Sequence, residues 1–183
     1  DAAVATRMTG PLLALVDAGD VYLPTETIDV LAAAHSHSKF GRAFSTLRER
    51  LQPLTQDSCI FYEDHALFDD YTGVVNDPDE GKRLAHALGD SKAAILANHG
   101  ILTVGHSIEE TIFWYVTMER TCQAELLALA AGGGIPISDD VARLTRSQVG
   151  HHLAGHFGAK PLFDWIRTVE IDLAPDAATA QSG

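Results

Sequence analysis

Short apolar runs alternate with capped helical segments along this chain, and this alternation constrains its fold more than any other feature. Each run is about five residues long and is bounded by turn-forming or polar residues, which predicts buried strands. The runs are Leu12–Val16, Val30–Ala34, Ser58–Tyr62, Ala93–Ala97 and Ile101–Val104. The last two flank Asn98-His99-Gly100 and predict two strands, or one bent strand with a break at the histidine.

Three segments carry the start and stop signals of helices. Asp77-Pro78-Asp79-Glu80 combines a cap, a proline and an acid, and Gly89 supplies the stop. Ser107-Ile-Glu-Glu110 is a capping box that opens a long helix ending before Gly132, and Ser138 begins a third helix that reaches Val149. The long helix is apolar over most of its circumference, so we expect it to be central in the domain or buried against another subunit.

Strands that alternate with helices predict an α/β sandwich. The 183 residues fit a single domain over 1–183, with a disordered tail at 173–183. The net charge of −12 argues against nucleic-acid and membrane-surface partners. We expect no membrane span and no signal peptide at 1–10. Only two cysteines are present, which favours a reducing cytoplasm.

The first chemical signal is His35-Ser-His37 at the end of an apolar run. Residues i and i+2 of a strand point to the same face, so both imidazoles could close on one metal ion. Any chain with nine histidines has a fair chance of such a pair, and a structural role is an equal alternative for this pattern alone.

The second signal is His99, which also ends a buried apolar run, where ligands usually bind in α/β sheets. Taken together, His35, His37 and His99 match a three-histidine metal site with an open position. Neutral imidazoles suit zinc, iron, cobalt or nickel, so the ligand set does not choose the metal.

The third signal is the segment 55–73, which places Tyr62, His65 and several carboxylates between aromatic residues. It could supply a general acid or base, or a fourth ligand, with a solvated acidic loop as the alternative. The remaining histidines are interpreted as surface or turn residues, and the late group His151, His152 and His156 as loop or subunit surface. Cys59 and Cys122 are interpreted as packing residues. Nucleotide-binding and serine-hydrolase motifs are absent.

The order of these motifs resembles the class II aldolase/adducin family. The residues that carry the resemblance are His35-Ser-His37, Leu54–Asp57, Ala93–Gly105 and the aromatic helix with Met118–Cys122, and it covers residues 30 to 167. The Phe-Tyr-Glu-Asp-His loop at 61–65 is similar to that of a bacterial branch.

The resemblance implies a three-layer α/β/α fold, a homotetramer and a divalent metal held by His35, His37 and His99. In the aldolases that metal is commonly zinc, and Fe²⁺, Mn²⁺ or Co²⁺ are alternatives. The implied activity is a lyase that breaks or forms a C–C bond in a small hydroxy-carbonyl substrate through an enediolate. Glu26 resembles the family's acid, and Tyr62 and His65 are further candidates for proton transfer.

Two family features are missing between residues 1 and 35. The helix expected between Glu26 and the histidine pair is absent, and Thr9-Gly10 is the only trace of the phosphate-binding loops. We therefore expect that segments are left out of this sequence, and a phosphorylated substrate has no support.

Two other functions are compatible with the same residues. One is a non-haem Fe(II) oxygenase or decarboxylase on the same fold. The other is a non-catalytic assembly module like adducin, which would be expected to have lost the metal ligands.

Overall fold

The computed structural model describes residues 4–7, 12–14, 22–24, 31–71 and 78–169. Its strands are β1 (Val4–Arg7), β2 (Leu12–Ala14), β3 (Tyr22–Pro24), β4 (Ala32–Ser36), β5 (His65–Phe68), β6 (Ala93–Leu96) and β7 (Gly100–Gly105). Its helices are α1 (Lys39–Ser45), α2 (Gln56–Cys59), α3 (Pro78–Leu88), α4 (Ile108–Ala130), α5 (Asp139–Val149) and α6 (His152–Val169). None of the described helices is long and apolar enough to cross a membrane.

The main sheet is mixed and has the strand order β1-β4-β7-β6-β5. β4 pairs antiparallel with β7, and β7 pairs antiparallel with β6. β5 joins the edge in parallel with β6, so that His65 lies opposite Ala93 and Phe68 opposite Leu96. β2 and β3 form a separate antiparallel pair.

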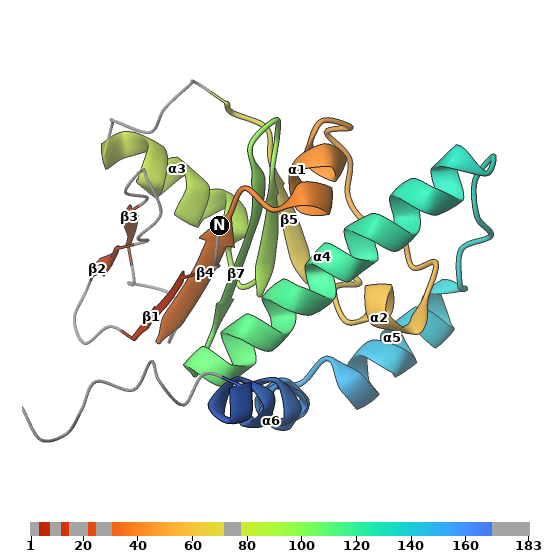
Figure 1. Ribbon diagram of the computed structural model, residues 1–183. Coiled ribbons are helices and arrows are strands. Elements are labelled where there is room, and N and C mark those ends of the chain that lie inside the picture. The colour runs from red at the N-terminus through yellow and green to blue at the C-terminus, as the bar shows by residue number, and fades with distance from the viewer. Residues whose placement is uncertain (1–3, 8–11, 15–21, 25–30, 72–77, 170–183) are drawn as a thin grey trace, which may run out of the picture.

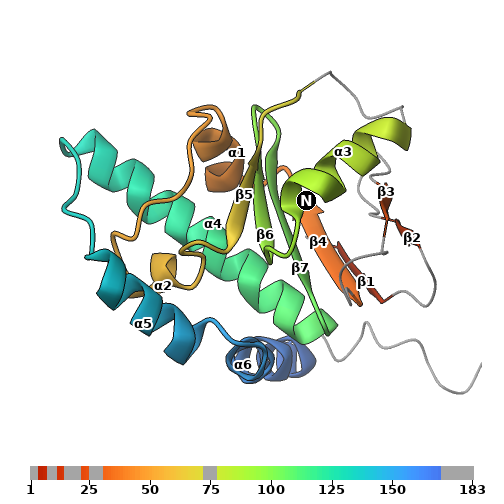
Figure 2. The same ribbon diagram turned by 180° about the vertical axis from the view of Figure 1, so that it is seen from behind.

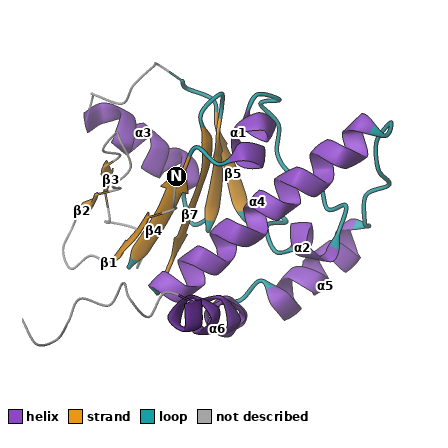
Figure 3. Cartoon of the chain, in the orientation of Figure 1, coloured by secondary structure: helices purple, strands orange, loops and turns teal. Residues whose placement is uncertain are grey.

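The described helices cover both faces of the sheet, which gives the three layers of an α/β/α sandwich (Figures 1, 2 and 3). On one face α3 places Leu84 and Leu88 against Ala94 and Leu96. On the other face α4 packs against Ala93 and Ile95, the alternate residues of the same strand β6. Because both faces are covered, β6 and β7 are buried throughout and their sequences are almost entirely apolar.

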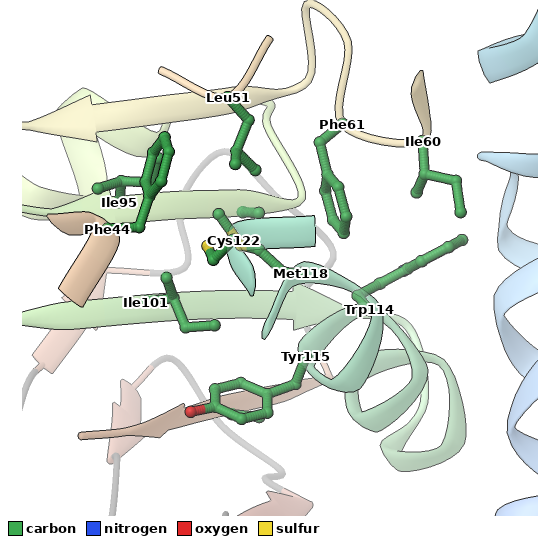
Figure 4. Close-up of a cluster of buried hydrophobic side chains, with 12 residues drawn as sticks. Phe44, Leu51, Ile60, Phe61, Ile95, Ile101, Trp114, Tyr115, Met118 and Cys122 are labelled. Atoms are coloured by element: carbon green, nitrogen blue, oxygen red, sulfur yellow. The ribbon is translucent and has the colours of Figure 1, made fainter. Parts of the chain in front are cut away.

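α4 is the central helix of its layer, as its apolar sequence predicts. Trp114, Tyr115, Met118 and Cys122 point into one cluster with Phe44 and Phe61 (Figure 4). The helix begins where Ser107 Oγ accepts the backbone N–H of Glu110 at 3.1 Å. The Glu110 carboxylate does not return to Ser107, as a complete capping box would require, but accepts the backbone N–H of His106 at 2.9 Å.

The sequence interpretation fails in several places, and one of them is the segment 55–73, which was interpreted as a loop but contains the edge strand β5. Ser58–Tyr62 is not a strand: its first two residues end α2 and the others form turns. Thr55 and Ser58 exchange side-chain to backbone hydrogen bonds that start the helix. α1 was not expected. Two of the three late histidines are not in a loop: His152 and His156 belong to α6, a helix that contains Pro161 and two glycines, whereas His151 lies just before it.

Candidate metal centre

A tight hairpin between β6 and β7 places His99. Leu96 pairs with Gly100, so that only residues 97–99 form the turn, and the backbone N–H of His99 donates to Leu96 O at 2.9 Å. Asn98 takes a φ of +58°, a left-handed conformation that asparagine tolerates better than most residues. A Cβ at Gly100 would lie 3.0 Å from Ser36 O, so glycine is what lets β7 approach the end of β4 here.

The neighbouring strand β4 brings the other two histidines to the same place. Its register pairs His35 with Leu102 and Ser36 with Ile101. His37, which follows Ser36, therefore lies at the same end of the sheet as the turn that contains His99. The centroids of the three rings are 4.7 to 5.4 Å apart, and His99 Nε2 lies 2.7 Å from His37 Nε2. One nitrogen from each ring lies within 4.8 Å of the others. The sequence therefore predicts correctly that these three side chains come together.

Burial and the neighbouring imidazoles disfavour a positive charge on His99. Desolvation, followed by the charges of His35 and His37, lowers the pKa of His99 to about 4. His35 Nδ1 lies 2.8 Å from Ile101 O, so it carries the proton and donates it to this carbonyl. Nε2 is then the nitrogen that His35 can offer to a cation. Neutral imidazoles with one directed nitrogen each are the form that metals bind.

α4 supports the chain on both sides of His37. The hydroxyl of Tyr115 bonds to the Ser36 side chain, and the Glu119 carboxylate accepts Ser38 Oγ at 2.6 Å. Glu119 also accepts the backbone N–H groups of Phe40 and Gly41 at 2.8 and 2.6 Å. A carboxylate at the start of α1 accepts hydrogen bonds from backbone N–H groups that have no partner within the helix. Its negative charge also interacts favourably with the positive end of the helix dipole. Sequence reasoning did not single out this supporting set.

Tyr71 is the aromatic residue that the structure places beside the triad. Its ring centroid lies 6.1 Å from that of His99, and the side chain is 52% exposed. It belongs to the aromatic segment 55–73, although Tyr62 and His65 were the members proposed for proton transfer. Parallel pairing of β5 with β6 explains the difference, since it carries residues after Phe68 toward the hairpin end.

The structure does not bring Tyr62 and His65 to the triad. The Tyr62 hydroxyl donates to Asp139 Oδ1 of α5 at 2.8 Å. His65 pairs with Ala93, at the opposite end of β6 from His99. Its Nδ1–H donates to Phe61 O at 2.6 Å, and its Nε2 accepts the N–H of Leu51 at 2.9 Å, so both ring nitrogens hold backbone groups. Glu26 and the tail 173–183 lie outside the described residues.

His65 predicts a pH dependence of stability. Burial lowers the pKa of His65. Protonation of Nε2 would also break the hydrogen bond that this nitrogen accepts from the Leu51 N–H. Below about pH 6.5 the unfolded chain therefore takes up a proton that the folded chain does not bind. We expect the free energy of unfolding to fall by up to about 1.4 kcal/mol per pH unit for this proton as the pH drops, and to be unaffected by it above pH 6.5.

Urea titrations of the metal-free protein at a series of pH values check this prediction. His65→Gln should lower stability at neutral pH. It should also reduce the slope of the unfolding free energy against pH by the amount that corresponds to about one proton. His86→Gln, at an exposed position on α3, is the matched control and should keep the slope. An unchanged slope in His65→Gln would contradict the assignment.

Comparisons with known proteins agree with this fold and this geometry. A family profile described as "Class II Aldolase and Adducin N-terminal domain" matches residues 25–126, which include the whole triad. The structure resembles an L-fuculose 1-phosphate aldolase from Glaciozyma antarctica PI12, with a TM-score of 0.71 and 35% identity over 84% of this chain and 70% of that one.

Two curated relatives come from Streptomyces. A 4-hydroxy-3-prenylphenylpyruvate oxygenase/4-hydroxy-3-prenylbenzoate synthase of Streptomyces roseochromogenus subsp. oscitans is 47% identical over 80% of this chain and 53% of its own length. The decarboxylase NovR of Streptomyces niveus is 44% identical over 80% of this chain and 54% of its own. The chain thus spans about half the length of these relatives. By its profile match and its fold, the chain belongs to the class II aldolase and adducin family.

Proposed function

We propose that the protein is a metal-dependent lyase that breaks or forms a C–C bond in a hydroxy-carbonyl substrate, with His35, His37 and His99 holding the metal. The observation that carries this proposal is the convergence of three imidazoles whose ligand nitrogens lie within 4.8 Å of one another. Ligands about 2.0–2.1 Å from a tetrahedral ion lie roughly 3.3 Å apart, so small shifts from these positions would seat a divalent ion. The donor set suits zinc, and iron, manganese or cobalt are alternatives.

A bound divalent ion would supply Lewis acidity toward the carbonyl and hydroxyl oxygens of the substrate. The protein's own groups then have three tasks. Ile101 O keeps the His35 proton on Nδ1, which directs Nε2 inward. Glu119 and Tyr115 fix the backbone around His37. The exposed phenol of Tyr71 lies where a substrate beside His99 would meet it, and we propose it as a proton carrier together with Glu26.

A second candidate is an oxygenase or decarboxylase acting on an aromatic oxo acid. The observation that favours it is the similarity to two relatives whose names state an oxygenase and a decarboxylase. Among the described residues, the triad includes no carboxylate, and three neutral histidines can hold Fe(II) with positions left open.

One experiment separates the two candidates. Protein stripped of metal and reloaded with Zn²⁺ or Fe²⁺ is incubated with ketoses, ketose 1-phosphates and hydroxyphenylpyruvate, with and without oxygen. Aldehyde release that needs metal but not oxygen supports the lyase. Oxygen uptake coupled to CO₂ release, with iron alone, supports the second candidate. If the triad is loaded and no C–C bond breaks in any substrate, both proposals fail.

A further inference from the structure

A second cluster of metal-ligating side chains lies at the far end of β7. His106 follows the last residue of this strand, Glu110 stands in the first turn of α4, and His152 is the first residue of α6. One ligand atom from each lies within 4.8 Å of the others. Six residues of extended strand separate this cluster from the triad, or about 20 Å. The second cluster is therefore spatially separate from the triad.

The distances within the cluster are compatible with ligands of a single cation. His152 Nδ1 lies 2.8 Å from Glu110 Oε1, and His106 Nδ1 lies 3.6 Å from Glu110 Oε2. The two ring centroids are 3.9 Å apart. The spacing of roughly 3.3 Å between ligands of a tetrahedral ion falls between the two measured values.

The carboxylate of Glu110 is held in place by groups outside the cluster. Trp114 Nε1 donates to Oε1 at 2.9 Å, and the backbone N–H of His106 donates to Oε2 at 2.9 Å. Glu110 is only 3% exposed. Gly155 lets α6 approach this point, because a Cβ there would lie 2.9 Å from Glu110 Cγ and closer still to the Trp114 ring. Such outer hydrogen bonds orient a ligand carboxylate before a metal arrives.

The two imidazoles are exposed, so an ion could reach the cluster from solvent. His152 lines a cavity of about 550 Å³ between α5, α6 and the start of β6, and His106 lines a smaller one of about 160 Å³. His156 lies one turn after His152 on α6, with its Nδ1 3.4 Å from Ser107 Oγ. Residues four apart share a helix face, so His156 lies on the same side of α6 as His152.

We propose that His106, Glu110 and His152 form a second divalent-cation site, which zinc can occupy. Two imidazoles and one carboxylate are a ligand set that zinc accepts with a position left open. A purely structural ion pair explains the burial of Glu110, but it does not require two exposed rings to meet edge to face over one carboxylate. The net charge of −12 favours cation binding in general. The site is independent of the proposed reaction.

Zinc binding to chelator-treated protein, measured by equilibrium dialysis, tests the site. The wild-type chain should bind two zinc ions, and a chain carrying His37→Ala and His99→Ala should keep one. Adding His152→Ala to that background should weaken the remaining site at least tenfold. His86→Ala in the same background is the matched control and should leave the affinity unchanged. Circular dichroism checks the fold of each variant.

A second readout does not depend on the triad variants. Co²⁺ bound at low coordination number absorbs in the visible region, and the wild-type spectrum should lose part of its intensity in His106→Ala and in His152→Ala. The proposal is overturned if the variant carrying His37→Ala and His99→Ala binds no zinc. It is also overturned if His152→Ala leaves both the zinc stoichiometry and the cobalt spectrum of the otherwise wild-type chain unchanged.

Discussion

Replacing His99 by alanine is expected to empty the triad and to lower kcat/KM by about a thousandfold or more. A divalent ion contributes several kcal/mol to transition-state stabilisation, and each 1.36 kcal/mol is a factor of ten in rate. His99 is the ligand contributed by the β6–β7 turn, while His35 lies in β4 and His37 directly follows it. Two imidazoles on one strand end leave the ion weakly held, so the loss should show in metal content as well as in turnover.

The measurement combines elemental analysis of the purified protein with the C–C cleavage assay. His37→Ala should behave like His99→Ala, and His99→Gln tests whether the loss comes from the ligand rather than from the turn. His86→Ala, at an exposed position on α3, should retain both metal and activity. Full metal occupancy of the triad in both alanine variants would rule out the coordination proposed here.

Replacing Trp114 by alanine is expected to cost about 3–5 kcal/mol of folding free energy. Trp114 is fully buried in the cluster of Figure 4, edge-on to Phe61 at a centroid distance of 6.5 Å. Lys92 Nζ lies 4.6 Å from the ring centroid on top of these apolar contacts. The substitution leaves a large cavity and also removes the donor to Glu110. Domains of this size are stable by only about 5–15 kcal/mol, so much of the margin would be lost.

Urea denaturation followed by circular dichroism measures this loss. Trp165→Ala is the matched control, because Trp165 is 62% exposed on α6. A surface substitution of this kind is expected to change stability by about 0.5 kcal/mol or less. A loss below about 1 kcal/mol for Trp114→Ala would mean that the α4 layer repacks and is not the rigid core described above.

The fold could be predicted wherever local signals and tertiary packing agree. The apolar runs at β4, β6 and β7, and the caps of α4 and α5, carry enough information by themselves. Ser58–Tyr62 was wrongly predicted as a strand. An apolar run of five residues is too short for its periodicity to distinguish a buried strand from a helical turn. α6 was missed because Gly155 and Gly158 lower helix propensity, although they are what lets this helix pack on Trp114 and Phe113.

The candidate site was half predictable. His35 and His37 share a strand face, and the position of His99 at a strand end follows from its flanking runs. The proximity of Tyr71 depends on the parallel pairing of β5 with β6, and the support from Glu119 joins residues about 80 positions apart. No local pattern carries such information. His106, Glu110 and His152 come together for the same reason, through the packing of α6 on α4.

The triad ligands stand at the adjoining ends of two hydrogen-bonded strands, β4 and β7. His35 lies in β4, His37 directly follows its last residue, and His99 ends the short turn before β7. The distances between the ligands are therefore set by the pairing of these strands. A change of loop length elsewhere in the chain should not alter those distances. A single inserted residue in the three-residue turn at 97–99 would shift His99 out of step with its partners. Substrate preference could thus diverge among relatives by exchange of the surrounding segments while the coordination geometry stays constant.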